Sequence, residues 1–151
     1  MTINVVKSYS AGGIVVNGKG EVVLVNQKKH GQEVASWSFP KGGIIRGESE
    51  LETAIREIRE ESGVVRLELI SELGKIERDK TPIDESREHF QIKVIDMFLF
   101  RTDQVVLMPL DSENPIALWM EIEKVTDRLT HQKDRDFFLS VKDLVIKHSK
   151  A

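Results

Sequence analysis

Runs of alternating hydrophobic and polar residues, rich in β-branched side chains, predict strands in both halves of the chain. These runs cover residues 10–16, 21–26, 37–39, 64–76 and 89–101. Asn17 and Gly18 lie between the first two runs, and this pair is typical of a tight hairpin turn. Loops are predicted for the polar segments 27–36, 77–88 and 102–115.

Two segments carry apolar residues at helical spacing and are predicted to form helices. The first begins near Ser49 and stops at Gly63. Ser49 and Glu52 are spaced as a capping box, and Gly63 suits the left-handed backbone conformation that often ends a helix. The apolar stripe that should face a core consists of Leu51, Ala54, Ile55 and Ile58. The second helix covers residues 134–148, and one or two helical turns are expected within 122–129.

The strand predicted at 89–101 contains two charged residues, Lys93 and Asp96, within a mostly apolar run. We interpret them as one polar face of the strand, and the alternative is that they line a cleft at the sheet surface. The continuous apolar segment 97–100 that follows is suited to burial on both faces.

The first predicted helix also carries three glutamates on one face, Glu57, Glu60 and Glu61, because positions three and four apart lie over one another. Like charges at this spacing destabilise a helix and invite a compensating cation. Arg56 and Arg59 point away from this patch on a helical wheel, and Arg56 is better placed to meet Glu52 or Glu60. A hard divalent ion, Mg²⁺ or Mn²⁺, suits the oxygen ligands that remain. The alternative is a solvated helix face.

These glutamates belong to a longer pattern. Its fixed positions are Gly42, Glu48, Arg56, Glu57, Ile58, Glu60, Glu61, Gly63 and Val64. The spacing resembles the complete signature of the Nudix hydrolase family, G-x5-E-x7-R-E-U-x-E-E-x-G-U, where U is aliphatic. A match of this length rarely arises by chance, which disfavours the solvated helix face. The preceding Phe-Pro-Lys-Gly-Gly segment, residues 39–43, resembles members that act on dinucleoside polyphosphates or diphosphoinositol phosphates.

The resemblance and the donor chemistry together imply roles for the charged residues of the signature. Glu57, Glu60 and Glu61 are expected to bind the metal, and the identity of the general base is left open. Arg56 is expected to hold a glutamate carboxylate through its planar guanidinium, and Glu48 is expected to hold the loop. All five are therefore candidate catalytic residues.

The loop before the helix is expected to approach metal and phosphate through the glycines Gly42, Gly43 and Gly47. The resemblance places the backbone carbonyl and the side chain of Lys41 near the metal, and the alternative is an exposed loop cation. Lys28, Lys29 and His30 suit either solvated surface or a rim that steers phosphate. Carboxylates outside the signature that could join the site are Glu85, Glu88, Asp111 and Glu113.

Length and composition narrow the class of protein. A chain of 151 residues suits one domain, and we expect a single Nudix hydrolase domain over 1–151. A net charge of −3 and a pI near 5.8 argue against a dedicated nucleic-acid surface. Without cysteine there is neither a disulfide nor a thiolate metal site. No segment suits a targeting peptide or a membrane span, so a cytoplasmic location is expected.

The order of elements and the resemblance imply an α/β fold, a Nudix-like α/β/α sandwich with a mixed central sheet. The implied activity is metal-dependent hydrolysis of the pyrophosphate linkage of a nucleoside diphosphate joined to another moiety, by water attack at phosphorus. The expected partner is a small-molecule nucleotide, with a dinucleoside polyphosphate favoured. A homodimer is common among the proteins that the chain resembles.

Several alternatives to that substrate stay open. They are a nucleoside triphosphate, ADP-ribose and the 5′ end of an RNA, and a catalytically inactive Nudix-fold binding or regulatory module is a further alternative. A diphosphoinositol substrate would need a much more basic pocket than the overall composition indicates.

Overall fold

The computed structural model describes residues 3–27, 35–80, 89–110 and 116–150. The strands within these ranges are β1 (Asn4–Val16), β2 (Glu21–Gln27), β3 (Ser36–Ser38), β4 (Lys41–Gly43), β5 (Glu68–Asp79), β6 (His89–Arg101) and β7 (Ile116–Glu121). The helices are α1 (Glu50–Ser62), the 3-10 helix η1 (Ile122–Lys124), α2 (Val125–Arg128) and α3 (Gln132–Ser149). None of these helices is long and apolar enough to cross a bilayer.

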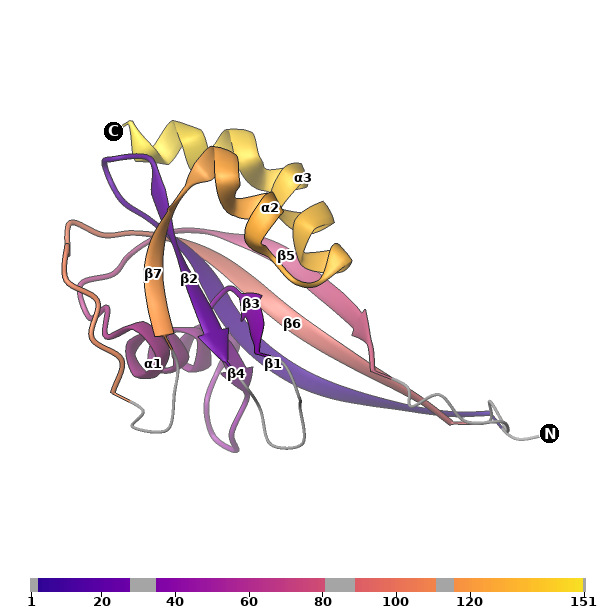
Figure 1. The fold of residues 1–151 in the computed structure, drawn as a ribbon. Coiled ribbons are helices and arrows are strands. Elements are labelled where there is room, and N and C mark those ends of the chain that lie inside the picture. The colour runs from indigo at the N-terminus through magenta and orange to yellow at the C-terminus, as the bar shows by residue number, and fades with distance from the viewer. Residues whose placement is uncertain (1–2, 28–34, 81–88, 111–115, 151) are drawn as a thin grey trace.

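One mixed sheet organises the described strands (Figure 1). β1 and β6 pair in parallel along the whole of β1, from Asn4 opposite His89 to Val16 opposite Arg101. The strand order is β3-β2-β1-β6-β5, and in addition β4 pairs with β1 and β7 pairs with β2. All of these pairs other than β1 with β6 are antiparallel. β4 and β7 are not among the predicted strands, because β4 is glycine-rich and β7 lacks a clear alternation.

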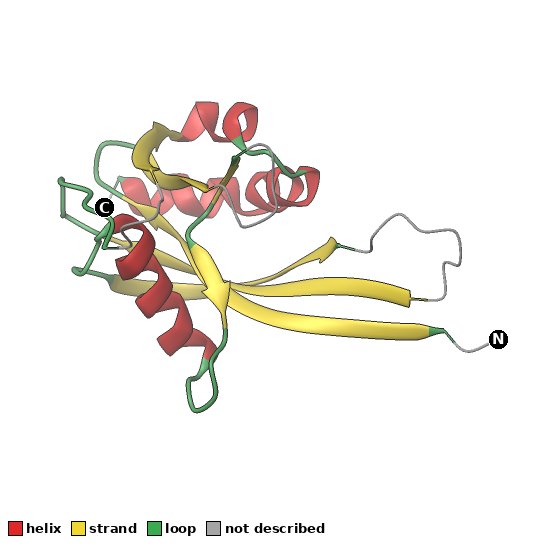
Figure 2. Ribbon diagram, turned by 60° about the horizontal axis from the view of Figure 1, so that its bottom comes forward, coloured by secondary structure: helices red, strands yellow, loops and turns green. Residues whose placement is uncertain are grey.

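Helices cover both faces of this sheet, α1 on one face and α2 and α3 on the other (Figures 1 and 2). Side chains alternate along β1, so Ile14 joins the core on the α3 side and Val15 joins the core on the α1 side. Phe138 of α3 fills the first core and Ile58 of α1 fills the second. The predicted α/β/α sandwich with a mixed sheet is therefore confirmed.

Several element boundaries differ from the sequence prediction because strand pairing extends the elements. β1 begins at Asn4 rather than at residue 10, since β6 offers hydrogen-bond partners along its entire length. β5 ends at Asp79 rather than at residue 76, since it also pairs along β6. α3 begins at Gln132, two residues before the predicted start.

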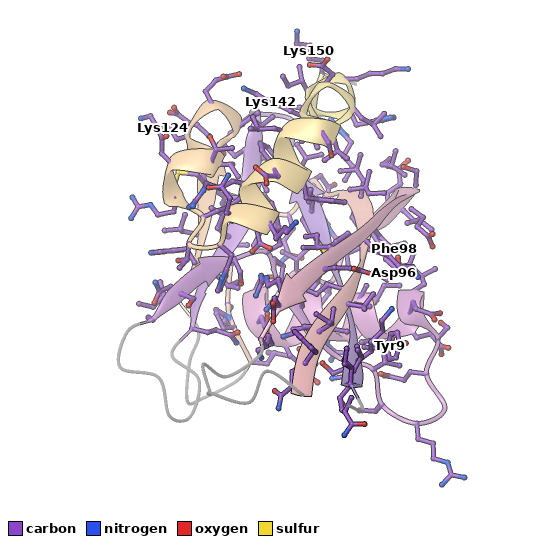
Figure 3. All side chains as sticks on the ribbon, turned by 90° about the vertical axis from the view of Figure 1, so that its right-hand side faces the viewer. Tyr9, Asp96, Phe98, Lys124, Lys142 and Lys150 are labelled. Atoms are coloured by element: carbon purple, nitrogen blue, oxygen red, sulfur yellow. The ribbon has the colours of Figure 1, made fainter. Side chains whose placement is uncertain are left out.

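The structure corrects the expectation that Lys93 and Asp96 form one polar face of β6. Lys93 lies on the same side as Ile95, toward α3, whereas Asp96 lies with Phe98 on the α1 side (Figure 3). Both charged residues are buried, and Asp96 Oδ1 has no hydrogen-bond partner among the described residues. Burial, reinforced by the charge of Glu72, raises the pKa of the Asp96 carboxyl.

Both predicted ends of α1 are confirmed. The Ser49 side chain accepts a hydrogen bond from the Glu52 backbone N–H at 3.1 Å, and the Glu52 carboxylate accepts one from the Ser49 N–H at 3.1 Å. Gly63 adopts a φ of 78°, and its N–H donates to the Arg59 carbonyl at 2.8 Å. This geometry ends the helix, as the left-handed conformation of glycine allows.

One residue of the predicted apolar stripe of α1 is misplaced. Ile55 is 42% exposed, whereas Ala54 and Ile58 are fully buried. The buried side of the helix also includes Thr53, Glu61 and Ser62. Ile55 therefore lies at the edge of the helix surface that meets the sheet, and the buried arc turns toward the glutamates.

We expect Gly63→Ala to lower the free energy of unfolding by at least about 2 kcal/mol. A Cβ atom at position 63 would lie 2.1 Å from the Met108 carbonyl oxygen, and the positive φ is strained for alanine. Urea denaturation measures the loss. Gly43→Ala is the matched control, because a Cβ there meets nothing within 4 Å. Equal stabilities of the two variants would contradict this account of the helix end.

Candidate active site

The three signature glutamates that lie on α1 share one end of the helix, but their environments differ. Glu61 is 6% exposed, while the side chain of Glu60 is 45% exposed. Glu61 Oε1 accepts the backbone N–H of Lys41 at 3.0 Å, and its Oε2 accepts the Gln27 side-chain amide at 3.0 Å. The carboxylate of Glu61 is therefore held between α1, β4 and the end of β2.

Burial raises the pKa of Glu61 to about 7. The Lys41 backbone hydrogen bond and the Lys41 charge oppose this increase, while the nearby Glu57 charge adds to it. A carboxyl with this pKa changes its protonation state near neutral pH. Any cation that binds beside Glu61 would favour its ionised form.

Glu57 packs directly against Gly42. A Cβ atom at position 42 would lie 2.1 Å from the carboxyl carbon of Glu57, so any larger residue would displace that carboxylate. Burial raises the pKa of Glu57, and the charge and hydrogen bond of Arg56 oppose the increase. Gly42 therefore approaches the Glu57 carboxylate closely, whereas a Cβ at Gly43 would lie in open space, and the approach of this loop to metal and phosphate stays a prediction.

Arg56 lies at the centre of the charged residues of the signature. Its Nε donates to Glu48 Oε2 at 2.8 Å, and its Nη2 donates to Glu48 Oε1 at 3.0 Å. Its Nη1 donates to Glu57 Oε1 at 2.8 Å and lies 3.3 Å from Glu60 Oε2. The pairing with Arg56 lowers the pKa of Glu48.

These contacts correct the expectation from the helical wheel that Arg56 points away from the glutamate patch. The guanidinium reaches across the helix surface because Glu48, in the loop before the helix, holds its other side. The contact of Arg56 with Glu60 is as predicted. Arg56 Nη2 also donates to the Gly43 carbonyl at 3.2 Å, so one side chain links the loop to the helix.

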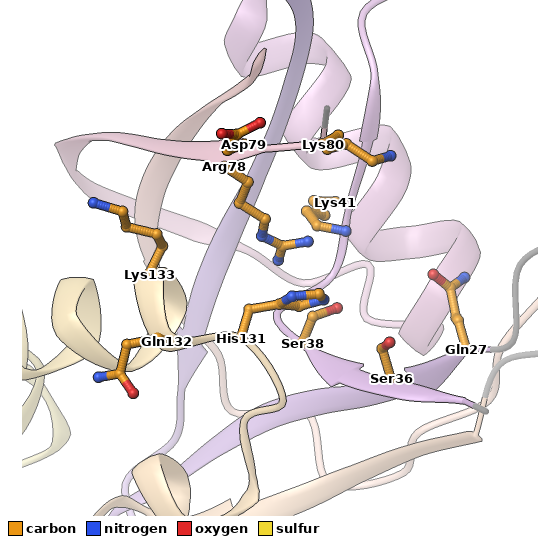
Figure 4. Close-up of a pocket in the computed structure, with 10 residues that line it drawn as sticks. All are labelled: Gln27, Ser36, Ser38, Lys41, Arg78, Asp79, Lys80, His131, Gln132 and Lys133. Carbon is orange, nitrogen blue, oxygen red and sulfur yellow. The ribbon is translucent and has the colours of Figure 1, made fainter. Parts of the chain in front are cut away.

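A cavity of about 300 Å³ lies between the ends of β2 and β5 and the start of α3 (Figure 4). Gln27 and Lys41 line it and also bind Glu61, so the cavity adjoins the glutamates. The other lining residues are Ser36, Ser38, Arg78, Asp79, Lys80, His131, Gln132 and Lys133. Lys41 is buried here, so it is not an exposed loop cation.

Most residues that line this cavity are absent from the sequence-based predictions. Arg78, Asp79 and Lys80 lie at the end of β5, and residues 131–133 lie at the start of α3. These segments are about 50 positions apart and share no local pattern, so no sequence signal joins them. Arg78 pairs with the buried Asp134 of α3, Nε to Oδ1 at 3.1 Å, and this ion pair holds the two segments together.

Some candidate residues lie outside the described ranges. They are Lys28, Lys29, His30, Glu85, Glu88, Asp111 and Glu113. Within the described ranges, no three acidic or histidine side chains converge as a ready group of metal ligands. The carboxylates instead contact Arg56, Gln27 and Lys41.

The buried Glu61 makes the stability of the metal-free protein depend on pH. The folded protein holds the Glu61 proton more tightly than the unfolded chain, in which the pKa is near 4.5. The stabilising contribution is therefore complete below pH about 4.5 and is lost as the pH rises through about 7. We expect the loss to be on the order of 3 kcal/mol.

Urea denaturation in EDTA at pH 5 and pH 8 measures this effect in the native protein and in Glu61→Gln. The amide cannot ionise, so the free energy of unfolding of Glu61→Gln relative to the native protein should increase between the two pH values. Glu50→Gln, at the exposed start of α1, is the control. Parallel pH profiles of Glu61→Gln and the native protein would contradict the burial effect.

Comparison with known proteins identifies the family. The NUDIX domain matches residues 6–141. The MutT4 protein of Mycobacterium tuberculosis is 31% identical over 135 residues, covering 86% of this chain and 52% of that protein. The RNA pyrophosphohydrolase of Pelagibacter ubique is 28% identical over 123 residues, covering 76% of this chain and 77% of that enzyme.

The fold agrees with solved structures. The Ap4A hydrolase of C. elegans has a TM-score of 0.66 at 20% identity, over 93% of this chain and 99% of that one. The chain spans about half the length of the first curated relatives that it matches. Since the NUDIX domain covers most of the chain and includes the whole glutamate signature, this chain belongs to the Nudix family.

Proposed function

We propose that this chain is a divalent-metal-dependent hydrolase that cleaves the pyrophosphate linkage of a nucleoside diphosphate joined to another moiety. The observation that carries the proposal is the buried Glu61 carboxylate, which is close to the charge of Glu57 and is held by Gln27 and Lys41, two residues that line the cavity. Removing a carboxylate from water is unfavourable unless a cation or hydrogen-bond donors stabilise it. A buried carboxylate is a cost to a helix that is only structural, but it suits a site that binds a cation.

The donor set fits Mg²⁺ or Mn²⁺, since Glu57, Glu60 and Glu61 offer only oxygen atoms. These three side chains would hold the ion, and their present contacts with Arg56 and Gln27 would rearrange. A bound divalent ion neutralises phosphate oxygens and lowers the pKa of a coordinated water. The carboxyl of Glu61 would release its proton as the metal site fills.

The other signature residues would position these ligands. Arg56, with two hydrogen bonds to Glu48, would orient Glu57 and Glu60 at the start of the reaction cycle. Gly42 would keep the space that the Glu57 carboxylate occupies. Lys41 would hold Glu61 through its backbone N–H and place its ammonium toward the substrate phosphates.

The favoured substrate within this class is a dinucleoside polyphosphate. The Phe-Pro-Lys-Gly-Gly lead-in supports it, and the fold is shared with an Ap4A hydrolase. The relative named RNA pyrophosphohydrolase favours the 5′ end of an RNA as a second candidate. Nucleoside triphosphates and ADP-ribose are further candidates, and an inactive binding module is the alternative to an enzyme. The homodimer and the cytoplasmic location stay predictions from the sequence.

We expect Mg²⁺-dependent release of nucleotide or phosphate products from a panel of these substrates. Glu57→Gln and Glu61→Gln should each lower kcat/KM by at least about 100-fold, because each removes a charge from the metal site. Glu50→Gln is the matched control, since Glu50 is an exposed glutamate of the same helix.

The measurement is product analysis with purified native and variant proteins, with Mg²⁺ or with EDTA. Turnover that survives EDTA, or that persists in Glu61→Gln, would contradict the proposed site. Absence of turnover on every substrate, with Mg²⁺ binding intact, would favour the binding module.

A further inference from the structure

Gln27 is the last residue of β2, and its side chain reaches α1. Its amide nitrogen donates to Glu61 Oε2 at 3.0 Å, across 34 positions of the sequence. The strand sets this direction, because Val25 packs in one core with Ile58 of α1, and residues two apart lie on the same side of a strand. Gln27 is also paired with Ser36 of β3, so its side chain starts from a fixed position.

Glu61 accepts a hydrogen bond on each carboxylate oxygen, and the two donors differ in kind. The Lys41 N–H that donates to Oε1 at 3.0 Å belongs to the backbone of β4, which is held by its pairing with β1. The donor to Oε2 is the side-chain amide of Gln27. A carboxylate turns easily about its last side-chain bond, since this torsion has broad minima. One donor does not stop that rotation, whereas donors on both oxygens fix the plane of the carboxylate.

The plane of the Glu61 carboxylate decides where its oxygens can bind a cation. Each oxygen of an ionised carboxylate can accept two partners, so a cation and the Gln27 amide can share Oε2. The contact with Gln27 can therefore adjust to a bound ion without being lost. Hydrogen bonds to a metal ligand orient that ligand, and removing one typically lowers metal affinity by about 10- to 100-fold.

Burial makes this donor important. A carboxylate in water replaces a lost donor with a water molecule, but Glu61 is only 6% exposed. Glu60 is the contrasting case, since 45% of its side chain is exposed and its carboxylate contacts Arg56 of the same helix. Gln27 lies outside the family signature, on a strand that precedes it. A residue beyond the signature thus supplies a donor to the buried signature glutamate.

From these contacts we infer that Gln27 is a positioning residue for the divalent metal ion and acts through Glu61. This inference rests on the proposed function, in which Glu61 binds the ion. Gln27 holds Oε2 while the Lys41 N–H holds Oε1, and together they turn the other lone pairs of the carboxylate toward one place. Without Gln27 the carboxylate must be ordered at the moment when the ion binds, and the affinity for the ion falls.

Binding of Mn²⁺, followed by electron paramagnetic resonance of the free ion, tests this role without turnover. Gln27→Met keeps the length of the side chain and removes the donor, and Gln27→Leu is a second variant without a donor. Gln27 is half-buried at a strand end, so both variants should fold, which urea denaturation in EDTA checks. Each should weaken Mn²⁺ binding about tenfold.

Gln91→Met is the matched control, because Gln91 is an exposed glutamine on β6, aligned with Val6. It should bind Mn²⁺ like the native protein. Equal Mn²⁺ affinity of the native protein and of both Gln27 variants would overturn the inference.

A double-mutant cycle shows whether Gln27 acts through Glu61. In the Glu61→Gln background, Gln27→Met should change Mn²⁺ affinity by less than about twofold, because the carboxylate that Gln27 orients is gone. In the Glu60→Gln background, the same change should again weaken binding about tenfold, since Glu60 contacts Arg56 instead. Equal losses in the two backgrounds would overturn the positioning role, because a merely structural effect does not depend on which glutamate is changed.

Turnover with Mg²⁺ gives a second readout. Gln27→Met should raise the Mg²⁺ concentration for half-maximal turnover about tenfold, with little change in kcat at saturating Mg²⁺. An unchanged Mg²⁺ requirement would overturn the role of Gln27 alone. Absence of Mn²⁺ binding by the native protein would instead overturn the proposed function, and this inference with it.

Discussion

The hydrogen bond from the Lys41 backbone N–H to Glu61 joins the two parts of the site that the sequence keeps apart. Lys41 belongs to β4, which pairs with β1, so the donor is part of the sheet rather than of a free loop. Glu61 lies on the last turn of α1, whose apolar residues pack on the same sheet. A buried carboxylate must have such donors, because an unpaired one would be far too costly. This contact therefore connects the helix, the strand and the site.

Acidic and basic side chains lie on different sides of this contact. The glutamates of α1 lie on one side of Lys41 and Gln27, and the basic cavity lies on the other. The overall charge of −3 conceals the division, because surface glutamates and lysines elsewhere nearly cancel. The overall charge therefore does not describe the charge of the cavity lining.

Arg56 shows which contacts of a side chain a helical wheel predicts and which it does not. The helical wheel places its Cα correctly, and the contact with Glu60 follows from the spacing of four residues. The wheel does not place the guanidinium, because Glu48 in the preceding loop draws it across Glu57. Side chains with several rotatable bonds are oriented by partners that a helix-only projection omits. The misplacement of Ile55 has a similar cause, since the sheet selects which arc of α1 is buried.

The sequence by itself determined the features that depend on neighbouring residues: the capping box at Ser49, the glycine end at Gly63, the run of glutamates and the family signature. Only the tertiary structure decided the burial of Glu61, the opposite faces of Lys93 and Asp96, and the cavity that joins Arg78 to His131. The physical reason is the range of the interactions. Caps and helix faces arise within a few residues, whereas the cavity depends on the pairing of β5 with β6 and on the ion pair between β5 and α3.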